Sequence, residues 1–264
     1  MAHIARKRFG QHFLVDQTVI RRIVSAIKPR PADRIVEIGP GQAALTQGLL
    51  DHCPHIEVIE LDRDLAQWLE KKYPRERLTV HSGDVLQFNF RTLDTQFRLV
   101  GNLPYNISTP LLCRLIEFRD LLIDQHYMLQ KEVVDRICAA PNTPEYGRLT
   151  VLLQIFFETE ALFDVPPESF DPPPRVNSAI IRLMPSQRQG DLPPVKVIEA
   201  VLGAAFSQRR KMIRTTLLKW LEQEGIVIEQ SPWAQLDGTL RPENLPVETY
   251  LQMALGVAAI RARA

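Results

Sequence analysis

Short apolar runs alternate with amphipathic segments from Pro31 to about Pro185. The runs have the length of buried strands, and the segments between them have helical periodicity. Strands that alternate with helices in this way are typical of a doubly wound α/β fold with a mostly parallel sheet. Near the end of this region, residues 156–165 and 177–183 form two strand-like runs joined by a proline-rich loop. Proline does not fit a central strand, so we expect an antiparallel hairpin at one edge of the sheet, with an exposed loop.

The pattern changes after Pro185. Residues 186–194 have the composition of a linker. Helical patterns separated by prolines follow over residues 195–206, 211–224 and 247–260. No glycine-rich turn or candidate acid–base group occurs among these helices. We therefore predict a Rossmann-like α/β domain over residues 1–185, a linker over 186–194 and a small all-helical domain over 195–264.

The first apolar run, residues 34–38, stops at Gly39-Pro40-Gly41 and leads into a helical pattern. Glycines at such a strand–helix turn let the backbone come close to a ligand. A second run, residues 57–62, carries Glu60 about twenty residues further on, the spacing expected for a carboxylate that binds ribose hydroxyls. We therefore expect a nucleotide-containing cofactor at the carboxyl ends of these strands.

Two more acids stand beside this expected cofactor site. Glu37 lies next to the glycine turn, and Asp84 ends a third strand-like run over residues 78–84. A carboxylate at the position of Asp84 can accept a hydrogen bond from the amino group of an adenine. In open α/β sheets ligands collect at the carboxyl ends of the strands, where all these acids fall.

A fourth motif, Asn102-Leu103-Pro104-Tyr105, follows the apolar run over residues 97–100. The amino group of adenine is a poor nucleophile because its lone pair is delocalised into the ring. A site that methylates it must accept hydrogen bonds from the amino protons and hold the base by an aromatic face. Asn102 offers a side-chain carbonyl, the residue before Pro104 offers a backbone carbonyl, and Tyr105 offers a ring. Four residues alone are equally compatible with an ordinary strand-ending turn.

The segment from Gly39 to Ala44 also satisfies the loose dinucleotide pattern Gly-x-Gly-x-x-Gly/Ala, so a nicotinamide-dependent dehydrogenase is an alternative. Glu37, Asp84 and the Asn102 motif favour S-adenosylmethionine, because a dehydrogenase has no need of Asn-Leu-Pro-Tyr.

With these motifs in place, the chain resembles the bacterial small-subunit rRNA adenine N6,N6-dimethyltransferases, the KsgA family. The resemblance covers nearly the whole chain. Beyond the motifs above, it rests on residues 6–14, 106–110, 128–133, 146–149, 170–176 and 206–211.

The resemblance implies an enzyme that transfers methyl groups from S-adenosylmethionine to two adjacent adenosines in the 3′-terminal hairpin loop of 16S rRNA. Its substrate would be the immature small ribosomal subunit. The resemblance implies that Asn102, together with Gly39, Glu60 and Asp84, contacts the cofactor, and we add Glu37 and Gly41 to that site. The segment around His12 and Leu14 would close over the methionine end. Phe170 would flank the target base opposite Tyr105, so the expected catalytic residues are Asn102, Leu103, Pro104, Tyr105 and Phe170.

Two departures from the family pattern stand out: His12 replaces the usual Asn, and Thr215 replaces an Asn found in many relatives. A histidine can still donate through one ring nitrogen, so His12 stays in the expected site. The expected chemistry is direct in-line transfer without a general base. Asn102 and the adjacent backbone carbonyl would stabilise the positive charge that develops on nitrogen.

Net charge is only +1 over 264 residues, but its distribution matters more than its sum for an RNA-binding protein. Basic residues gather at Arg6-Lys7-Arg8 and at Arg209-Arg210-Lys211, and we expect both clusters to contact phosphates. With 45% hydrophobic residues the chain can bury a substantial core. No apolar run reaches membrane length, and Cys53, Cys113 and Cys138 have neither metal nor disulfide spacing. We expect a monomeric cytoplasmic enzyme without a metal.

Two further alternatives remain at this point. A large-subunit rRNA adenine methyltransferase of the antibiotic-resistance type shares these motifs, although the long helical tail favours the small-subunit enzyme. A non-catalytic RNA-binding or transcription factor on the same scaffold would be expected to alter Asn102 or Asp84, and both are intact.

Overall fold

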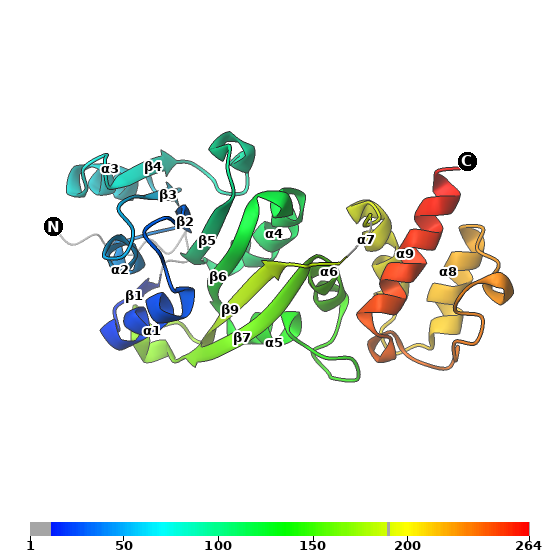
Figure 1. The fold of residues 1–264 in the computed structure, drawn as a ribbon. Helices are drawn as coiled ribbons and strands as arrows, with labels where there is room; N and C mark the ends of the chain where they lie inside the picture. The colour runs from blue at the N-terminus through cyan, green and yellow to red at the C-terminus, as the bar shows by residue number, and fades with distance from the viewer. Residues whose placement is uncertain (1–11, 189–190, 264) are drawn as a thin grey trace. The chain divides into compact units, whose positions relative to one another are not determined.

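The computed structural model describes residues 12–188 and 191–263, which divide into two compact units (Figure 1). The first unit comprises residues up to Val134 together with Glu158–Pro185, and the second comprises Asp135–Phe157 and the chain from Ser186 onward. Residues 135–157, expected in the α/β domain, thus belong to the helical unit. The physical reason is that α6 (Arg148–Phe156) packs against α7 (Val195–Phe206) and α9 (Val247–Arg261).

The first unit is built on a seven-stranded sheet with the order β4-β3-β2-β5-β6-β9-β7. Its strands are β2 (Ile35–Ile38), β3 (Ile56–Glu60), β4 (Leu78–Ser82), β5 (Phe97–Asn102), β6 (Leu122–Gln130), β7 (Phe157–Val165) and β9 (Ser178–Pro185). Adjacent strands from β4 to β6 pair in parallel, whereas β9 pairs antiparallel with β6. The prediction of a mostly parallel sheet with an antiparallel edge is confirmed.

Helices alternate with the parallel strands, as the sequence pattern predicted. Helix α2 (Ala44–Leu50) connects β2 to β3, α3 (Arg63–Lys72) connects β3 to β4, and α4 (Tyr105–Leu115) lies between β5 and β6. Helix α1 (Gln17–Ile27) precedes β2, and α5 (Lys131–Ile137) follows β6. A separate two-stranded ladder, which the sequence did not predict, joins β1 (Phe13–Leu14) to β8 (Phe170–Asp171). In the part of the chain that the structure describes, no helix is long and apolar enough to cross a membrane.

Successive strands of the chain are added on one side of β2 and then on its other side. The chain runs outward from β2 to β3 and β4, and then returns to place β5 on the other side of β2. Loops that leave β2 and β5 therefore diverge at the carboxyl edge of the sheet, which is where open α/β sheets bind ligands. Both the glycine turn and the Asn102 turn start at this point.

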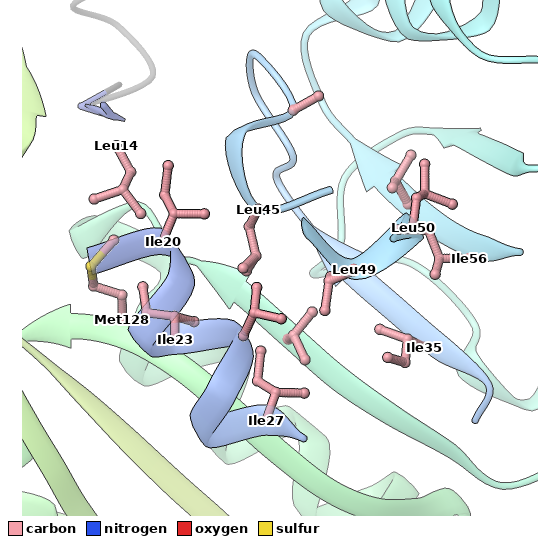
Figure 2. Packing of buried hydrophobic residues seen from close by; sticks show 14 of the residues in the cluster. Leu14, Ile20, Ile23, Ile27, Ile35, Leu45, Leu49, Leu50, Ile56 and Met128 are labelled. Atoms are coloured by element: carbon pink, nitrogen blue, oxygen red, sulfur yellow. The ribbon is translucent and has the colours of Figure 1, made fainter. Parts of the chain in front are cut away.

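A hydrophobic cluster packs α1 and α2 onto the sheet. Asp16 caps the N-terminus of α1, and its carboxylate accepts hydrogen bonds from the backbone amides of Thr18 and Val19. Its buried isoleucines recur with helical spacing, and Figure 2 shows Ile20, Ile23 and Ile27 lying toward α2. Burying one such side chain contributes about 1.5–3 kcal/mol, so this apolar face holds α1 on the sheet.

A buried arginine ties the end of α1 to the sheet. The guanidinium of Arg98 on β5 donates to Asp124 at 2.7 Å, to Asp33 at 2.7 Å and to the carbonyl of Ile27 at 2.6 Å. Helix carbonyls at a C-terminus have no partner within the helix, and Arg98 supplies one. The two carboxylates balance its charge away from water.

The second unit is helical. Helix α7 packs against α6, α8 (Leu217–Gln223) and α9. The predicted helix over residues 211–224 begins later than expected, because the backbone amides of Ile213 and Arg214 donate to the carbonyls of Leu240 and Gly238. Buried Tyr146 anchors the loop before α6 by donating its hydroxyl to the carbonyl of Leu245 at 2.8 Å.

Candidate functional site

The glycine turn after β2 adopts a backbone that few side chains tolerate. Gly39 and Gly41 have φ angles of +62° and +56°, in the left-handed region where glycine carries no steric penalty. The amide of Gly39 donates to the carbonyl of Ile59 at 2.9 Å, which ties the turn to β3. A Cβ on Gly41 would lie 3.1 Å from the ring of Phe13, so the absence of a side chain also allows β1 to approach.

Glu60, at the end of β3, is oriented by two backbone amides. Its Oε2 accepts from the amide of Gly41 at 3.2 Å, and its Oε1 accepts from the amide of Asp62 at 2.8 Å. Burial raises the pKa of Glu60, and these two hydrogen bonds oppose the rise. The carboxyl group is thus held beside the glycine turn, as the spacing of residues 39 and 60 predicted.

Glu37, on β2, is buried, with 2% of its surface exposed. The hydroxyl of Thr46 on α2 donates to its Oε2 at 2.6 Å. Burial raises the pKa of Glu37 to about 8; the Thr46 hydrogen bond opposes this and the nearby Glu60 adds to it. Asp84 follows β4 and accepts the amide of Leu86 at 2.9 Å.

The turn after β5 places Asn102 and Tyr105 at the same edge. The Nδ2 of Asn102 donates to the backbone carbonyl of His12 at 3.0 Å, so the other end of the amide, its Oδ1, is an acceptor. The hydroxyl of Tyr105 lies 2.9 Å from that of Ser178 on β9. Burial raises the pKa of Tyr105, so it stays neutral near pH 7.

His12 closes this part of the site. Its Nδ1 lies 2.8 Å from the carbonyl of Pro172, and its ring stacks on that of Tyr105 with centroids 6.0 Å apart. His12 thus connects the N-terminal segment to the Asn102 turn and to the proline-rich loop.

These groups surround one cavity of about 290 Å³ in the first unit. Among the residues predicted for the site, the structure brings these to its lining: His12, Leu14, Glu37, Gly39, Gly41, Glu60, Asp84, Asn102, Leu103, Pro104 and Tyr105. The acids on β2 and β3, the acid after β4 and the Asn102 turn thus line the same cavity.

Phe170 lies elsewhere. Its side chain is 4% exposed and belongs to the hydrophobic cluster that contains Leu14 and Ile20. It is not among the described residues that line the cavity. Pairing of β8 with β1, which sets Phe170 opposite Leu14, accounts for this burial.

The structure describes one of the two basic clusters that were predicted to contact phosphates. Arg6, Lys7 and Arg8 lie outside the described residues. In the second unit, the guanidinium of Arg209 donates to the carbonyls of Pro144 and Tyr146, the latter at 2.9 Å. Arg210 and Lys211 are exposed.

The sequence did not indicate several residues of this site, and three of them have polar side chains placed at it. Thr46 and Ser178 hold Glu37 and Tyr105, and His126 on β6 also lines the cavity. Ser178 lies 73 residues from Tyr105 along the chain, and no local motif connects the two. His126 lies in the middle of β6, and a single histidine in a strand gives no functional signal.

Comparison with known proteins identifies the family of the chain. The family model described as ribosomal RNA adenine dimethylase matches residues 2–258. A Dechloromonas aromatica protein named ribosomal RNA small subunit methyltransferase A is 49% identical over 253 residues, 96% of this chain and 97% of the relative. A Variovorax paradoxus protein of the same name is 50% identical over 261 residues, covering 97% of this chain and 98% of the relative.

Solved structures show the same fold. A dimethyladenosine transferase from Plasmodium falciparum has a TM-score of 0.78 and 26% identity, with 95% of this chain and 98% of that chain covered. The 23S rRNA methyltransferase ErmE has a TM-score of 0.70 and 25% identity, with coverage of 94% and 99%. Because the family model spans nearly the whole sequence and the relatives are about half identical, this chain belongs to the ribosomal RNA adenine dimethylase family.

Proposed function

We propose that the cavity at the β2–β5 switch point binds S-adenosylmethionine and that the Asn102 turn presents an rRNA adenine to it. The protein is an S-adenosylmethionine-dependent methyltransferase that dimethylates adenines of small-subunit rRNA. The orientation of the Asn102 amide is the main support for its role toward the adenine. Its Nδ2 is used by the carbonyl of His12, and its amide oxygen is therefore the atom available to accept from an amino group.

The residues present fit the cofactor. A cation on sulfur and a cationic amino group suit a cavity lined by carboxyl groups, and its described lining contains no lysine or arginine. Glu60 is placed to bind the ribose, and Asp84 the amino group of the cofactor's adenine. Gly39 and Gly41 bring the backbone close, while His12 and Leu14 cover the methionine end. When bound, S-adenosylmethionine supplies an electrophilic methyl group.

The acceptor side of the site acts by orientation and charge. The amide oxygen of Asn102 and the backbone carbonyl before Pro104 accept the two amino protons of the adenine. This pulls the nitrogen toward a tetrahedral geometry and stabilises the positive charge that develops as the N–C bond forms and the C–S bond breaks. Tyr105 holds the face of the base, and Ser178 fixes the ring of Tyr105 through its hydroxyl. The proton then leaves to solvent, so no side chain has to act as a general base.

The role of Phe170 as the second wall of the base pocket requires a rearrangement of β8, because the side chain is buried in the core. Of the residues around Tyr105, His12 is the one whose ring already stacks on it. The catalytic set that the geometry supports directly is Asn102, Leu103, Pro104 and Tyr105.

The target is two adjacent adenosines in the 3′-terminal hairpin loop of 16S rRNA, within an immature small subunit. The enzyme acts in the cytoplasm as a monomer. The helical unit, which comprises Asp135–Phe157 and the chain from Ser186 onward, serves as the RNA-docking part. Arg210 and Lys211 are its phosphate ligands, since both are exposed. Arg209 has the different task of holding the loop before α6. The cluster Arg6-Lys7-Arg8 is proposed as a second phosphate contact.

A direct test uses purified protein, labelled S-adenosylmethionine, and three acceptors: undermethylated small subunits, large subunits and DNA. We expect label in small subunits, in dimethyladenosine, with the position mapped by mass spectrometry. Label in an adenine of large-subunit rRNA would instead establish the activity of the 23S type. Absence of transfer to every acceptor, with intact cofactor binding, would favour a non-catalytic RNA-binding role.

A further inference from the structure

The side chains that line the cavity include several acids and no strongly basic group among the described residues. Four of its lining residues bear carboxyl groups, namely Glu37, Glu60, Asp62 and Asp84, and none of the described lining residues is a lysine or an arginine. Carboxylates that share a cavity repel one another, and burial weakens their solvation. At least one of them is therefore expected to be neutral until a cation arrives.

Glu37 differs from its neighbours in the partners that it has. Glu60 accepts from two backbone amides, and Asp62 and Asp84 accept from one each; every such bond favours the charged form. The hydrogen bond recorded for Glu37 comes from the hydroxyl of Thr46, at 2.6 Å. This bond favours the charged form, but it is a single neutral donor, and a hydroxyl can also accept a proton from a carboxylic acid.

The enclosure of Glu37 makes the neutral form the stable one in the free protein. Only 2% of its surface is exposed, and burying an unpaired carboxylate costs several kcal/mol. Burial accordingly raises the pKa of Glu37 to about 8, which leaves it mostly protonated at pH 7.

We propose that Glu37 holds a proton in the cofactor-free pocket and releases it to solvent when a cationic group of S-adenosylmethionine enters. The resulting carboxylate then neutralises the bound cation. Glu37 thereby selects a positively charged methyl donor and couples cofactor binding to proton release. The inference rests on the proposed function, because it assumes that this cavity is the S-adenosylmethionine site.

Other titratable groups line the same cavity. His12 comes from the segment before β1, Tyr105 from α4, and His126 and Tyr127 from β6. The lining residues from α1 and α2 carry no titratable group. Burial raises the pKa of both tyrosines, so neither changes charge between pH 6 and pH 7. Because these side chains share the cavity, the experiment includes a variant that removes the carboxyl group of Glu37 alone.

The expected pH dependence follows from the direction of the shift. A group whose pKa is about 8 in the free protein and far lower in the complex loses close to one proton on binding at pH 6 to 7. Affinity for S-adenosylmethionine should then rise about tenfold per pH unit in this range and level off as the pH passes the pKa of the free protein. The amino group of the cofactor titrates at about 7.7–8.0, so measurements between pH 6 and 7 keep it protonated.

The test is isothermal titration calorimetry of the full-length protein with S-adenosylmethionine, in buffers of equal pH but different ionisation enthalpy. The dependence of the observed heat on the buffer measures the protons released. We expect nearly one proton for the wild type and close to none for Glu37→Gln, which mimics the protonated side chain. Glu60→Gln is the matched control: it should bind more weakly and still release the proton. A thermal melt checks that each variant is folded.

Three ligands identify the cation. S-adenosylhomocysteine has the ammonium without the sulfonium, and 5′-methylthioadenosine has neither. Release with the first ligand but not the second assigns the ammonium, and release with S-adenosylmethionine alone assigns the sulfonium; either result supports the proposal. Equal release with 5′-methylthioadenosine, unchanged release by Glu37→Gln, or no release from the wild type would overturn it while leaving cofactor binding intact. Failure of the wild type to bind S-adenosylmethionine would instead overturn the proposed function, and this inference with it.

Discussion

Replacing Asn102 by alanine tests how the site activates an adenine. The variant removes the amide oxygen that accepts an amino proton and also the Nδ2 that donates to the carbonyl of His12 at 3.0 Å. Loss of one preorganised charge-stabilising contact lowers turnover about a hundredfold or more, which corresponds to about 2.7 kcal/mol in the barrier. Loss of the bond to His12 removes about 0.5–1.5 kcal/mol, which limits the effect on cofactor affinity to about tenfold.

The two effects separate in different assays. Single-turnover transfer of labelled methyl groups to undermethylated small subunits, at saturating cofactor, reports the chemical step. Calorimetry with S-adenosylmethionine reports binding. Asn89→Ala is a matched control, because Asn89 caps a short helical turn and is not among the described residues that line the cavity. The control should transfer methyl groups at the wild-type rate. Transfer by Asn102→Ala within about threefold of the wild type would refute the role given to the amide oxygen.

Further predictions concern cofactor binding, RNA binding and stability. Glu60→Ala should weaken S-adenosylmethionine binding by about 1.5–3 kcal/mol in calorimetry, and unchanged affinity would remove Glu60 from the site. The double variant Arg210→Ala/Lys211→Ala should flatten the slope of log affinity for rRNA against log salt by about 1.4–1.8 without changing cofactor affinity; an unchanged slope would place the docking surface elsewhere. Arg98→Met should lower the free energy of unfolding by up to about 3 kcal/mol, because the partly buried carboxylates of Asp33 and Asp124 lose their cation. Arg91→Ala, which breaks the exposed pair with Asp120, should change the free energy of unfolding measured with denaturant very little. Equal losses of stability in the two variants would contradict the view that burial makes the Arg98 ion pairs important.

The order of strands and helices could be predicted because it depends on patterns that repeat within a few residues. An apolar run that ends at Gly39 and Gly41 indicates a strand and a tight turn whatever follows later in the chain. The bounds predicted for the helix over residues 195–206 match α7, whose pattern begins after a proline. The helix predicted from residue 211 starts later, since backbone amides there bond to a loop more than twenty residues away.

Some features of the candidate site could also be predicted from the sequence, and others could not. The spacing between Gly39, Glu60 and Asp84 could be read along the chain, because parallel strands bring their carboxyl ends to one edge of the sheet. The resemblance to a known family added the roles of these residues. Neither the spacing nor the resemblance indicated that Thr46 would be the hydrogen-bond donor recorded for Glu37, or that the guanidinium of Arg209 would hold backbone carbonyls of its own unit.

Only the tertiary structure decided the remaining features. His12 meets the carbonyl of Pro172 across 160 residues, and Asn102 meets the carbonyl of His12 across 90. Phe170 is buried through the pairing of two short strands that carry no sequence pattern. Periodicity and turn chemistry are local properties of the chain, and they determine which elements form. The partner of a buried polar group and the protonation of Glu37 depend on which distant segments exclude water from it, and that is settled only when the chain is packed.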